Sequence, residues 1–238
     1  MENSNSRHER GNAMSNIRLV DVNKVYNLAK SNEFYALKNI NLEINSGEIV
    51  ILKGVSGSGK STLLSLIGGL SKPTSGDIMV NEHNIAKLPD IRSSFYRHEH
   101  VGFIFQSFNL LNGLSVYQNV MAPLTLTHLS AAQIEQKIND ALNIANIAHK
   151  KSQKVSDLSG GEKQRCAIAR AIVMNPSVIL ADEPTANLDA QNSLMFVDTL
   201  KTFKQMGKTV LVATHDVLFE EVAPLDRCIH MKDGQLVI

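Results

Sequence analysis

The chain lacks the features expected of a nucleic-acid-binding, membrane-spanning or disulfide-stabilised protein. Its 24 Lys and Arg stand against 23 Asp and Glu, a net charge of +1, and so balanced a charge argues against a partner such as DNA or RNA. No apolar run approaches the roughly 20 residues of a membrane-spanning helix. The only two cysteines, Cys166 and Cys228, provide neither a disulfide framework nor a metal spacing, which predicts a reduced, cytosolic setting.

What the sequence does contain is an alternation of strand and helix patterns. Residues 1–16 are polar and without an apolar period, so we expect a disordered tail. Residues 17–51 alternate polar and apolar side chains, which predicts antiparallel strands with one solvent-exposed face. Continuous apolar strands are predicted at 48–53, 178–181 and 210–213, each beside a helical pattern, which favours a parallel α/β sheet.

Residues at the ends of two further elements, a helix and a hairpin, indicate where these elements begin or turn. Ser130 and Gln133 form a predicted capping box that opens a helix reaching Ala145, whose apolar residues share one face. This helix belongs to a segment of about 90–158 that we interpret as an inserted helical subdomain. The chain closes with a predicted hairpin turned by Asp233 and Gly234.

A glycine-rich loop lies between the strand at 48–53 and the helical pattern that follows. It fits the pattern G-x-x-x-x-G-K-[ST], and a buried strand before it and a helix after it are the context that indicates phosphate binding. Glycines let the backbone N–H groups approach phosphate oxygens, and the helix N-terminus favours the same anion. A glycine- and serine-rich turn without function is a poor alternative in this context. The residues of the loop are Gly54, Val55, Ser56, Gly57, Ser58, Gly59, Lys60, Ser61 and Thr62.

Three other strands are followed by polar residues. Asp182 and Glu183 follow the strand at 178–181, and two carboxylates there are costly unless a cation needs them. Beside a phosphate loop, Asp182 would hold Mg²⁺ and Glu183 would accept a proton from an attacking water. His215 and Gln106 also follow apolar strands. Taken alone, each of these two is more often an incidental residue than a ligand-binding one.

Ser159, Gly160 and Gly161 begin a second helix with an apolar stripe. Taken alone, a serine N-cap followed by glycines is the commoner explanation. The same geometry also binds anions, and this cradle has no lysine or metal ligand of its own. A simple explanation of a second cradle is that it contacts the nucleotide bound to a neighbouring molecule.

With these motifs in one order, the chain resembles the nucleotide-binding subunit of an ATP-binding cassette (ABC) transporter from about residue 17 to 238. The resemblance implies an α/β P-loop NTPase core with an N-terminal antiparallel β subdomain (17–89 and 159–238) and an inserted helical subdomain (about 90–158). It also implies ATP and Mg²⁺ as cofactors and a homodimer.

The same resemblance implies roles for individual residues. Tyr26, or Tyr35 as the fallback, would stack on adenine. Ser159 to Gly161 would close on the γ-phosphate across the dimer, where Asp189 lies in the crossing loop. The resemblance assigns catalysis to Glu183, His215, Gln106 and Lys60. It assigns the metal to Ser61, Gln106 and Asp182.

The segments Gly102–Leu111, Leu66–Leu70 and Ala181–Asp189 resemble one subgroup more narrowly. That subgroup contains the ATPases of lipoprotein-releasing complexes, of macrolide and peptide exporters, and of the bacterial cell-division ABC pair. We therefore expect a peripheral ATPase on the cytoplasmic face of the inner membrane, bound to integral-membrane permease subunits and powering export or extraction of a lipoprotein, peptide or drug.

Two alternatives stay open at this point. The first is a regulatory ATPase of the cell-division type, which transmits force through a membrane partner without moving a solute. The second is an ABC-type ATPase that acts on DNA or ribosomes. The near-neutral charge and the single cassette without a long coiled-coil insertion oppose the second alternative, and we expect no nucleic-acid partner.

Overall fold

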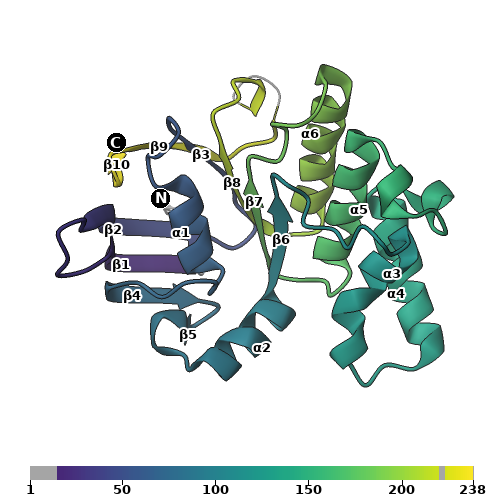
Figure 1. Ribbon diagram of the computed structural model, residues 1–238, viewed down its shortest axis with the longest axis horizontal. Coiled ribbons are helices and arrows are strands. Elements are labelled where there is room, and N and C mark those ends of the chain that lie inside the picture. The colour runs from purple at the N-terminus through teal and green to yellow at the C-terminus, as the bar shows by residue number, and fades with distance from the viewer. Residues whose placement is uncertain (1–14, 220–222, 238) are drawn as a thin grey trace, which may run out of the picture.

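A computed structural model describes residues 15–219 and 223–237 (Figure 1). Of the predicted disordered tail, residues 1–14 lie outside the described ranges. Residues 15 and 16 differ from that expectation because they begin the first strand, β1 (Ser15–Tyr26). Asn16 is buried, and its Nδ2 donates a hydrogen bond to Thr209 Oγ1 at 2.6 Å. A partner 193 positions away thus orders the start of the strand.

The N-terminal residues form the antiparallel sheet that the alternating pattern predicts. Its strand order is β2-β1-β4-β5, and a register shift between Lys24 and Val25 separates two parts of the β1–β2 ladder. The remaining strands of this sheet are β2 (Phe34–Asn45), β4 (Ser75–Val80) and β5 (His83–Asn84).

The second sheet has six strands in the order β10-β9-β3-β8-β7-β6. All neighbouring strands are parallel except β9 and β10, which form an antiparallel hairpin with both Asp233 and Gly234 at positive φ. This hairpin confirms the predicted turn. The strands are β3 (Ile49–Lys53), β6 (Val101–Phe105), β7 (Val178–Asp182), β8 (Thr209–Thr214), β9 (Arg227–Lys232) and β10 (Gln235–Val237).

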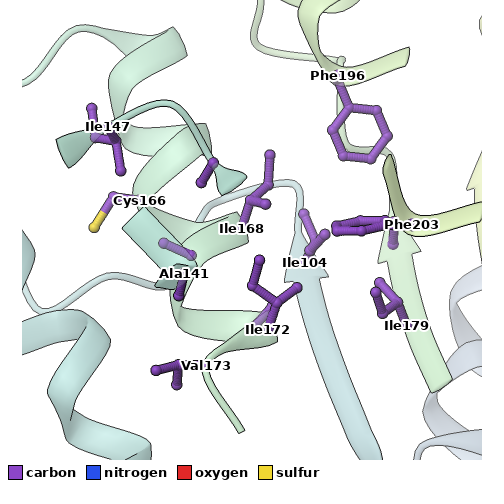
Figure 2. Packing of buried hydrophobic residues seen from close by; sticks show 14 of the residues in the cluster. Ile104, Ala141, Ile147, Cys166, Ile168, Ile172, Val173, Ile179, Phe196 and Phe203 are labelled. Carbon is purple, nitrogen blue, oxygen red and sulfur yellow. The ribbon is translucent and has the colours of Figure 1, made fainter. Parts of the chain in front are cut away.

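Period-two side-chain alternation divides the core between the two faces of this sheet. On β3, Ile49 and Ile51 belong to one buried cluster, whereas Val50 and Leu52 belong to the other. The first cluster includes residues of α5 (Gly160–Ile172) and α6 (Ala190–Gln205), and Figure 2 shows Ile104 between Ile168 and Phe203 within it. The second includes residues of α1 (Lys60–Ile67) and of the antiparallel sheet, and Figure 1 shows α1 lying between that sheet and the six-stranded one. Burial on both faces explains why the parallel strands are continuously apolar.

Helix α1 (Lys60–Ile67) starts inside the glycine-rich loop and ends at Gly68. A Cβ atom at Gly68 would lie 1.9 Å from Cζ of Phe103, so only glycine lets β6 pack this closely. The other long helices are α2 (Asp90–His100), α4 (Ala131–Ile144), α5 (Gly160–Ile172) and α6 (Ala190–Gln205).

The segment 90–158 is largely helical, but β6 within it pairs with β7 in the six-stranded sheet. Helix α2 lies before β6 in this segment and helix α4 after it, so a strand of the core sheet interrupts the helices. Helix α4 carries the predicted capping box, in which Ser130 Oγ accepts from Gln133 N and Gln133 Oε1 accepts from Ser130 N. The shorter elements are α3 (Val116–Met121) and the 3-10 turns Ile85–Lys87, Ala122–Leu126, Ala148–Lys150 and Val155–Asp157.

Among the described residues, no helix combines the length and apolar character that crossing a bilayer requires.

Candidate active site

A cleft of about 390 Å³ opens where β3, β6, β7 and β8 end. Parallel strands present their carboxyl ends at one edge of a sheet, which is the usual place for a ligand in such folds. The volume lies in the range of ordinary small-molecule sites. Lining the cleft are Tyr26, Phe34, Ala36, Ser56, Gly57, Ser58, Gly59, Lys60, Ser61, Thr62, Gln106, Glu183 and His215.

The glycine-rich loop is shaped by its contacts with the end of β9. A Cβ atom at Gly54 would lie 2.4 Å from the Met231 carbonyl oxygen, so no larger residue fits there without a shift of backbone. Gly59 has φ +106, which side chains rarely allow. Ser58 Oγ is buried and has no hydrogen-bond partner within the described chain. An unpartnered donor in a glycine cradle fits a site that receives an oxygen-rich anion.

The Lys60 ammonium lies across this loop. Its Nζ donates to the carbonyl oxygens of Gly54 at 2.6 Å and Val55 at 3.2 Å, and lies 3.7 Å from the Glu183 carboxylate. Only 6% of this side chain is exposed. A buried ammonium surrounded by neutral carbonyls and one carboxylate is a strong anion-binding group, because little water competes for it.

Asp182 and Ser61 meet although they are 121 positions apart, with Ser61 Oγ donating to Asp182 Oδ1 at 2.9 Å. Burial raises the pKa of Asp182, while the hydrogen bond from Ser61 opposes that rise. A carboxylate held in a half-buried position gains from a cation beside it. A hydroxyl and a carboxylate next to a phosphate cradle are also the oxygen ligands that suit Mg²⁺. The residues therefore fit the metal that the sequence predicts.

Glu183 lies between the Lys60 ammonium and the His215 imidazole at the cleft. His215 Nδ1 is 3.0 Å from its carboxylate, and Lys60 is on the other side. The backbone of Glu183 is in the left-handed region at φ +44, and its N–H donates to Ala213 O at 2.8 Å. Such a conformation is costly for a residue with a long side chain and often marks a functional position. The side chain of Glu183 is 16% exposed and that of His215 is 69% exposed, so this pair faces the opening.

Gln106 also lines the cleft. Two side chains, Asn187 and Arg170, donate hydrogen bonds to the backbone of its loop. Asn187 Nδ2 donates to the carbonyl oxygen of Gln106 at 2.9 Å. Arg170 of α5 donates to the carbonyl oxygens of Phe108 and Asn109. These bonds were not predicted from the sequence, since nothing local marks Arg170 or Asn187 as partners of this loop. They connect the cleft to helix α5.

The second cradle, Ser159 to Gly161, is not among the residues that line the cleft. Ser159 instead caps α5: its Oγ accepts from Glu162 N, and the Glu162 carboxylate accepts from Ser159 N. The hydrogen bond from the backbone N–H of Ser159 is the main cause of the lowered pKa of Glu162. Ser159, Gly160 and the nearby Asp189, which caps α6, are all exposed. One chain therefore exposes Ser159 and Gly160 outside the cleft that its phosphate loop lines, while Gly161 is buried.

Of the two aromatic residues predicted to contact a base, Tyr26 lines the cleft and Tyr35 does not. Phe34, which the sequence analysis did not name, is in the lining instead. Little in the sequence indicates that Phe34 lines the cleft, because a phenylalanine before a tyrosine is common in strands. Only the pairing of β1 with β2 shows which of the two aromatic residues faces the cleft.

Comparison with known proteins now decides the family. A family model described as ABC transporter matches residues 37–186. The chain belongs to the ABC transporter family. As a member it is an ATP-binding cassette, and its enzymatic activity is ATP hydrolysis.

Three relatives are similar to this cassette, two of them over nearly their whole length. The lipoprotein-releasing system ATP-binding protein LolD of Pseudoalteromonas translucida is 40% identical, covering 92% of this chain and 93% of the relative. The macrolide export ATP-binding/permease protein MacB of Campylobacter jejuni is 39% identical over 84% of this chain, but the match spans only 31% of MacB. An uncharacterized ABC transporter ATP-binding protein of Methanocaldococcus jannaschii, MJ0796, is 40% identical over 92% of this chain and 94% of its own length.

Solved structures of that archaeal cassette have the same fold. A dimeric post-hydrolysis state bound to ADP and Pi gives a TM-score of 0.85 at 38% identity, covering 93% of this chain and 97% of the other. A second dimeric structure of the same protein gives the same values. The α/β fold expected from the sequence is confirmed by these neighbours.

We predict that Lys60→Ala lowers the affinity of the cassette for ATP by about 10- to 100-fold, the loss expected when a charge-assisted hydrogen bond is removed from a buried site. The exposed Lys87 supplies the control, since Lys87→Ala removes the same charge far from the cleft. Isothermal titration with ATP measures both variants. Normal affinity in Lys60→Ala contradicts the assignment of the loop as the phosphate site.

Proposed function

We propose that the chain is the ATP-binding and hydrolysing subunit of a bacterial ABC system and acts as a homodimer on integral-membrane permease subunits. The work it powers is export or extraction of a lipoprotein, peptide or drug from the cytoplasmic face of the membrane. One observation carries the proposal: residues of the phosphate loop line the cleft, whereas Ser159 and Gly160 are exposed outside its lining. Two chains facing each other unite them.

The proposed dimer unites two sets of groups that one chain presents separately. The cleft is lined by Lys60 and Ser61, which bonds to Asp182, and His215 is exposed at its opening. The Ser159–Gly161 cradle supplies the backbone N–H groups at the start of α5, and Lys150 Nζ lies 3.1 Å from Oε1 of its capping residue Glu162. An isologous two-fold arrangement pairs each cleft with the other chain's cradle and builds two equal sites. The solved structures of the relative MJ0796 are dimeric, which supports a dimer of this chain.

Within each site, the chain's residues divide the work. The loop of Gly54 to Thr62 and Lys60 bind the phosphates, and Tyr26 contacts the base. Ser61, Asp182 and Gln106 would hold Mg²⁺, which when bound offsets the charge of the phosphates. Asp189 lies beside Ser159 in the face that closes on the partner's nucleotide.

Glu183 acts as the general base that takes a proton from the attacking water. Its carboxylate faces the cleft opening and is held in place by His215. His215, exposed at the opening, contacts the terminal phosphate and orients Glu183. Hydrolysis removes the phosphate that joins the two faces, so ATP favours the closed dimer and ADP does not.

The membrane partner docks near the Gln106 loop. Phe103 and Phe105 of β6 stack at 5.2 Å between ring centroids and are only half-buried, and Leu111 is 50% exposed. Apolar side chains beside a cleft residue provide a contact surface for a segment of a permease. The name of the macrolide-export relative, which joins ATP-binding and permease parts in one protein, supports such a partner.

We expect Glu183→Gln to lower turnover by about 10²- to 10⁴-fold, the contribution of a general base, while ATP still converts the protein to a dimer. Light scattering with and without ATP measures the assembly, and phosphate release measures turnover. Glu99→Gln, at a carboxylate 62% exposed, is the control and keeps full activity. Undiminished turnover in Glu183→Gln removes that residue from the base role.

Mixing two inactive variants tests the shared site. Lys60→Ala disables the loop, and Gly160→Phe blocks the cradle at an exposed position where a Cβ meets only Asn187 O at 3.4 Å. A mixed dimer has one doubly damaged site and one intact site, so an equal mixture regains about a quarter of wild-type turnover. The control mixes Lys60→Ala with a variant that carries both Lys60→Ala and Gly160→Phe. No mixed dimer then has an intact site, so turnover is not regained. No recovery in the first mixture argues that each chain works alone.

For the membrane contact, we predict that Phe108→Ala lowers stimulation of ATP hydrolysis by the purified permease and leaves basal hydrolysis unchanged. The matched control is Phe95→Ala, which truncates a 62% exposed phenylalanine on α2, the helix that precedes β6. Hydrolysis is measured with and without the permease recovered from membranes with the tagged chain. Equal loss of basal and stimulated activity shows that Phe108 is needed for folding instead.

A further inference from the structure

The base end of the cleft is built by the hairpin of β1 and β2. Three of its residues line the cleft: Tyr26 from β1, and Phe34 and Ala36 from β2. Phe34 is 57% exposed and Tyr26 is 43% exposed. Two aromatic rings are thus open to solvent at one end of a site whose other end holds the phosphate loop.

The pairing of the strands places both rings on one side of the hairpin. Tyr26 and Phe34 are direct cross-strand partners, and such partners project from the same face. Ala36 also lines the cleft, at the register shift where Leu37 pairs with Lys24 and Tyr35 pairs with Val25. Tyr35 lies between Phe34 and Ala36 on the opposite face. The two neighbouring aromatic residues, Phe34 and Tyr35, therefore differ in orientation although they are similarly exposed.

The Tyr26 ring is already covered in part. Lys24 Nζ lies over it, 5.1 Å from the ring centroid, and the same ammonium donates to the carbonyl oxygen of Lys72 at 2.7 Å. A cation over one face fixes the ring and occupies that face. A base that stacks on Tyr26 must use the opposite face, and Tyr26 alone then offers limited apolar area.

We propose that Phe34 is a second base-contacting residue, which with Tyr26 forms a two-ring wall that holds a purine. The inference rests on the ATP site proposed above and adds its base selectivity. Aromatic rings stack on any base without reading its edge, so the wall selects by stacking area. A bicyclic purine covers both rings, whereas a pyrimidine covers less. The site then prefers purine over pyrimidine nucleotides and discriminates weakly between adenine and guanine.

The test compares Phe34→Ala with Tyr35→Ala, because these two side chains are adjacent in sequence, similarly exposed and oppositely directed. Isothermal titration with ADP, CDP and pyrophosphate avoids hydrolysis and separates the base from the phosphates. In Phe34→Ala we expect ADP affinity to fall about five- to tenfold, the effect of losing one stacking ring. CDP affinity falls less and pyrophosphate affinity is unchanged. Tyr35→Ala keeps all three affinities, and Phe34→Trp restores ADP binding.

Three outcomes overturn the inference. Unchanged ADP affinity in Phe34→Ala shows that the ring does not contact the base. A parallel fall for pyrophosphate shows that the substitution distorts the phosphate loop. Equal losses in Phe34→Ala and Tyr35→Ala show a general effect on the hairpin. Failure of the proposed ATP site itself is distinguishable, because the unmodified protein then binds neither ADP nor pyrophosphate.

Discussion

The parallel pairing of β3, β8, β7 and β6 is the constraint on which the active site depends. Neighbouring strands of a sheet lie roughly 4.8 Å apart, so the groups that follow their ends are brought within contact of one another. This pairing is why Ser61 reaches Asp182 and why Glu183 lies between Lys60 and His215. Side chains that alternate between two buried clusters hold the strands in register. A slip of one residue would exchange the two faces of a strand and misplace the carboxylates at its end.

The site of a single chain is complete in its cations and carboxylates but not in its enclosure. The cradle at Ser159 and Gly160 is exposed outside the cleft that holds Lys60. In the dimer that we propose, a nucleotide bound between two chains would contribute energy to their association, and its hydrolysis would withdraw that energy. The proposal thus couples the chemistry of the site to the assembly of the two chains.

Helix α5 and the Gln106 loop are joined by hydrogen bonds that would couple the proposed dimer contact to the cleft. Arg170 joins α5 to the loop through two carbonyl oxygens, and Asn187 joins the loop to the segment after β7. The cradle lies at the start of the same helix. Under the proposal, a partner chain that displaced the cradle would also displace the loop, because both are attached to this helix. The base end of the cleft is separate, because it is formed by the β1–β2 hairpin and the rings of Tyr26 and Phe34.

Local signals in the sequence were enough for the glycine-rich loop, the capping box of Ser130 and Gln133 and the hairpin at Asp233, because each depends on nearby hydrogen bonds and backbone angles. Tertiary structure decided the rest. It placed β6 in the core sheet, ordered Asn16 through Thr209, and turned Phe34 instead of Tyr35 toward the cleft. It also separated the second cradle from the first. These outcomes depend on strand order, on a register shift in β1 and on partners up to 193 positions away, and periodicity along a single segment carries no record of such distant contacts.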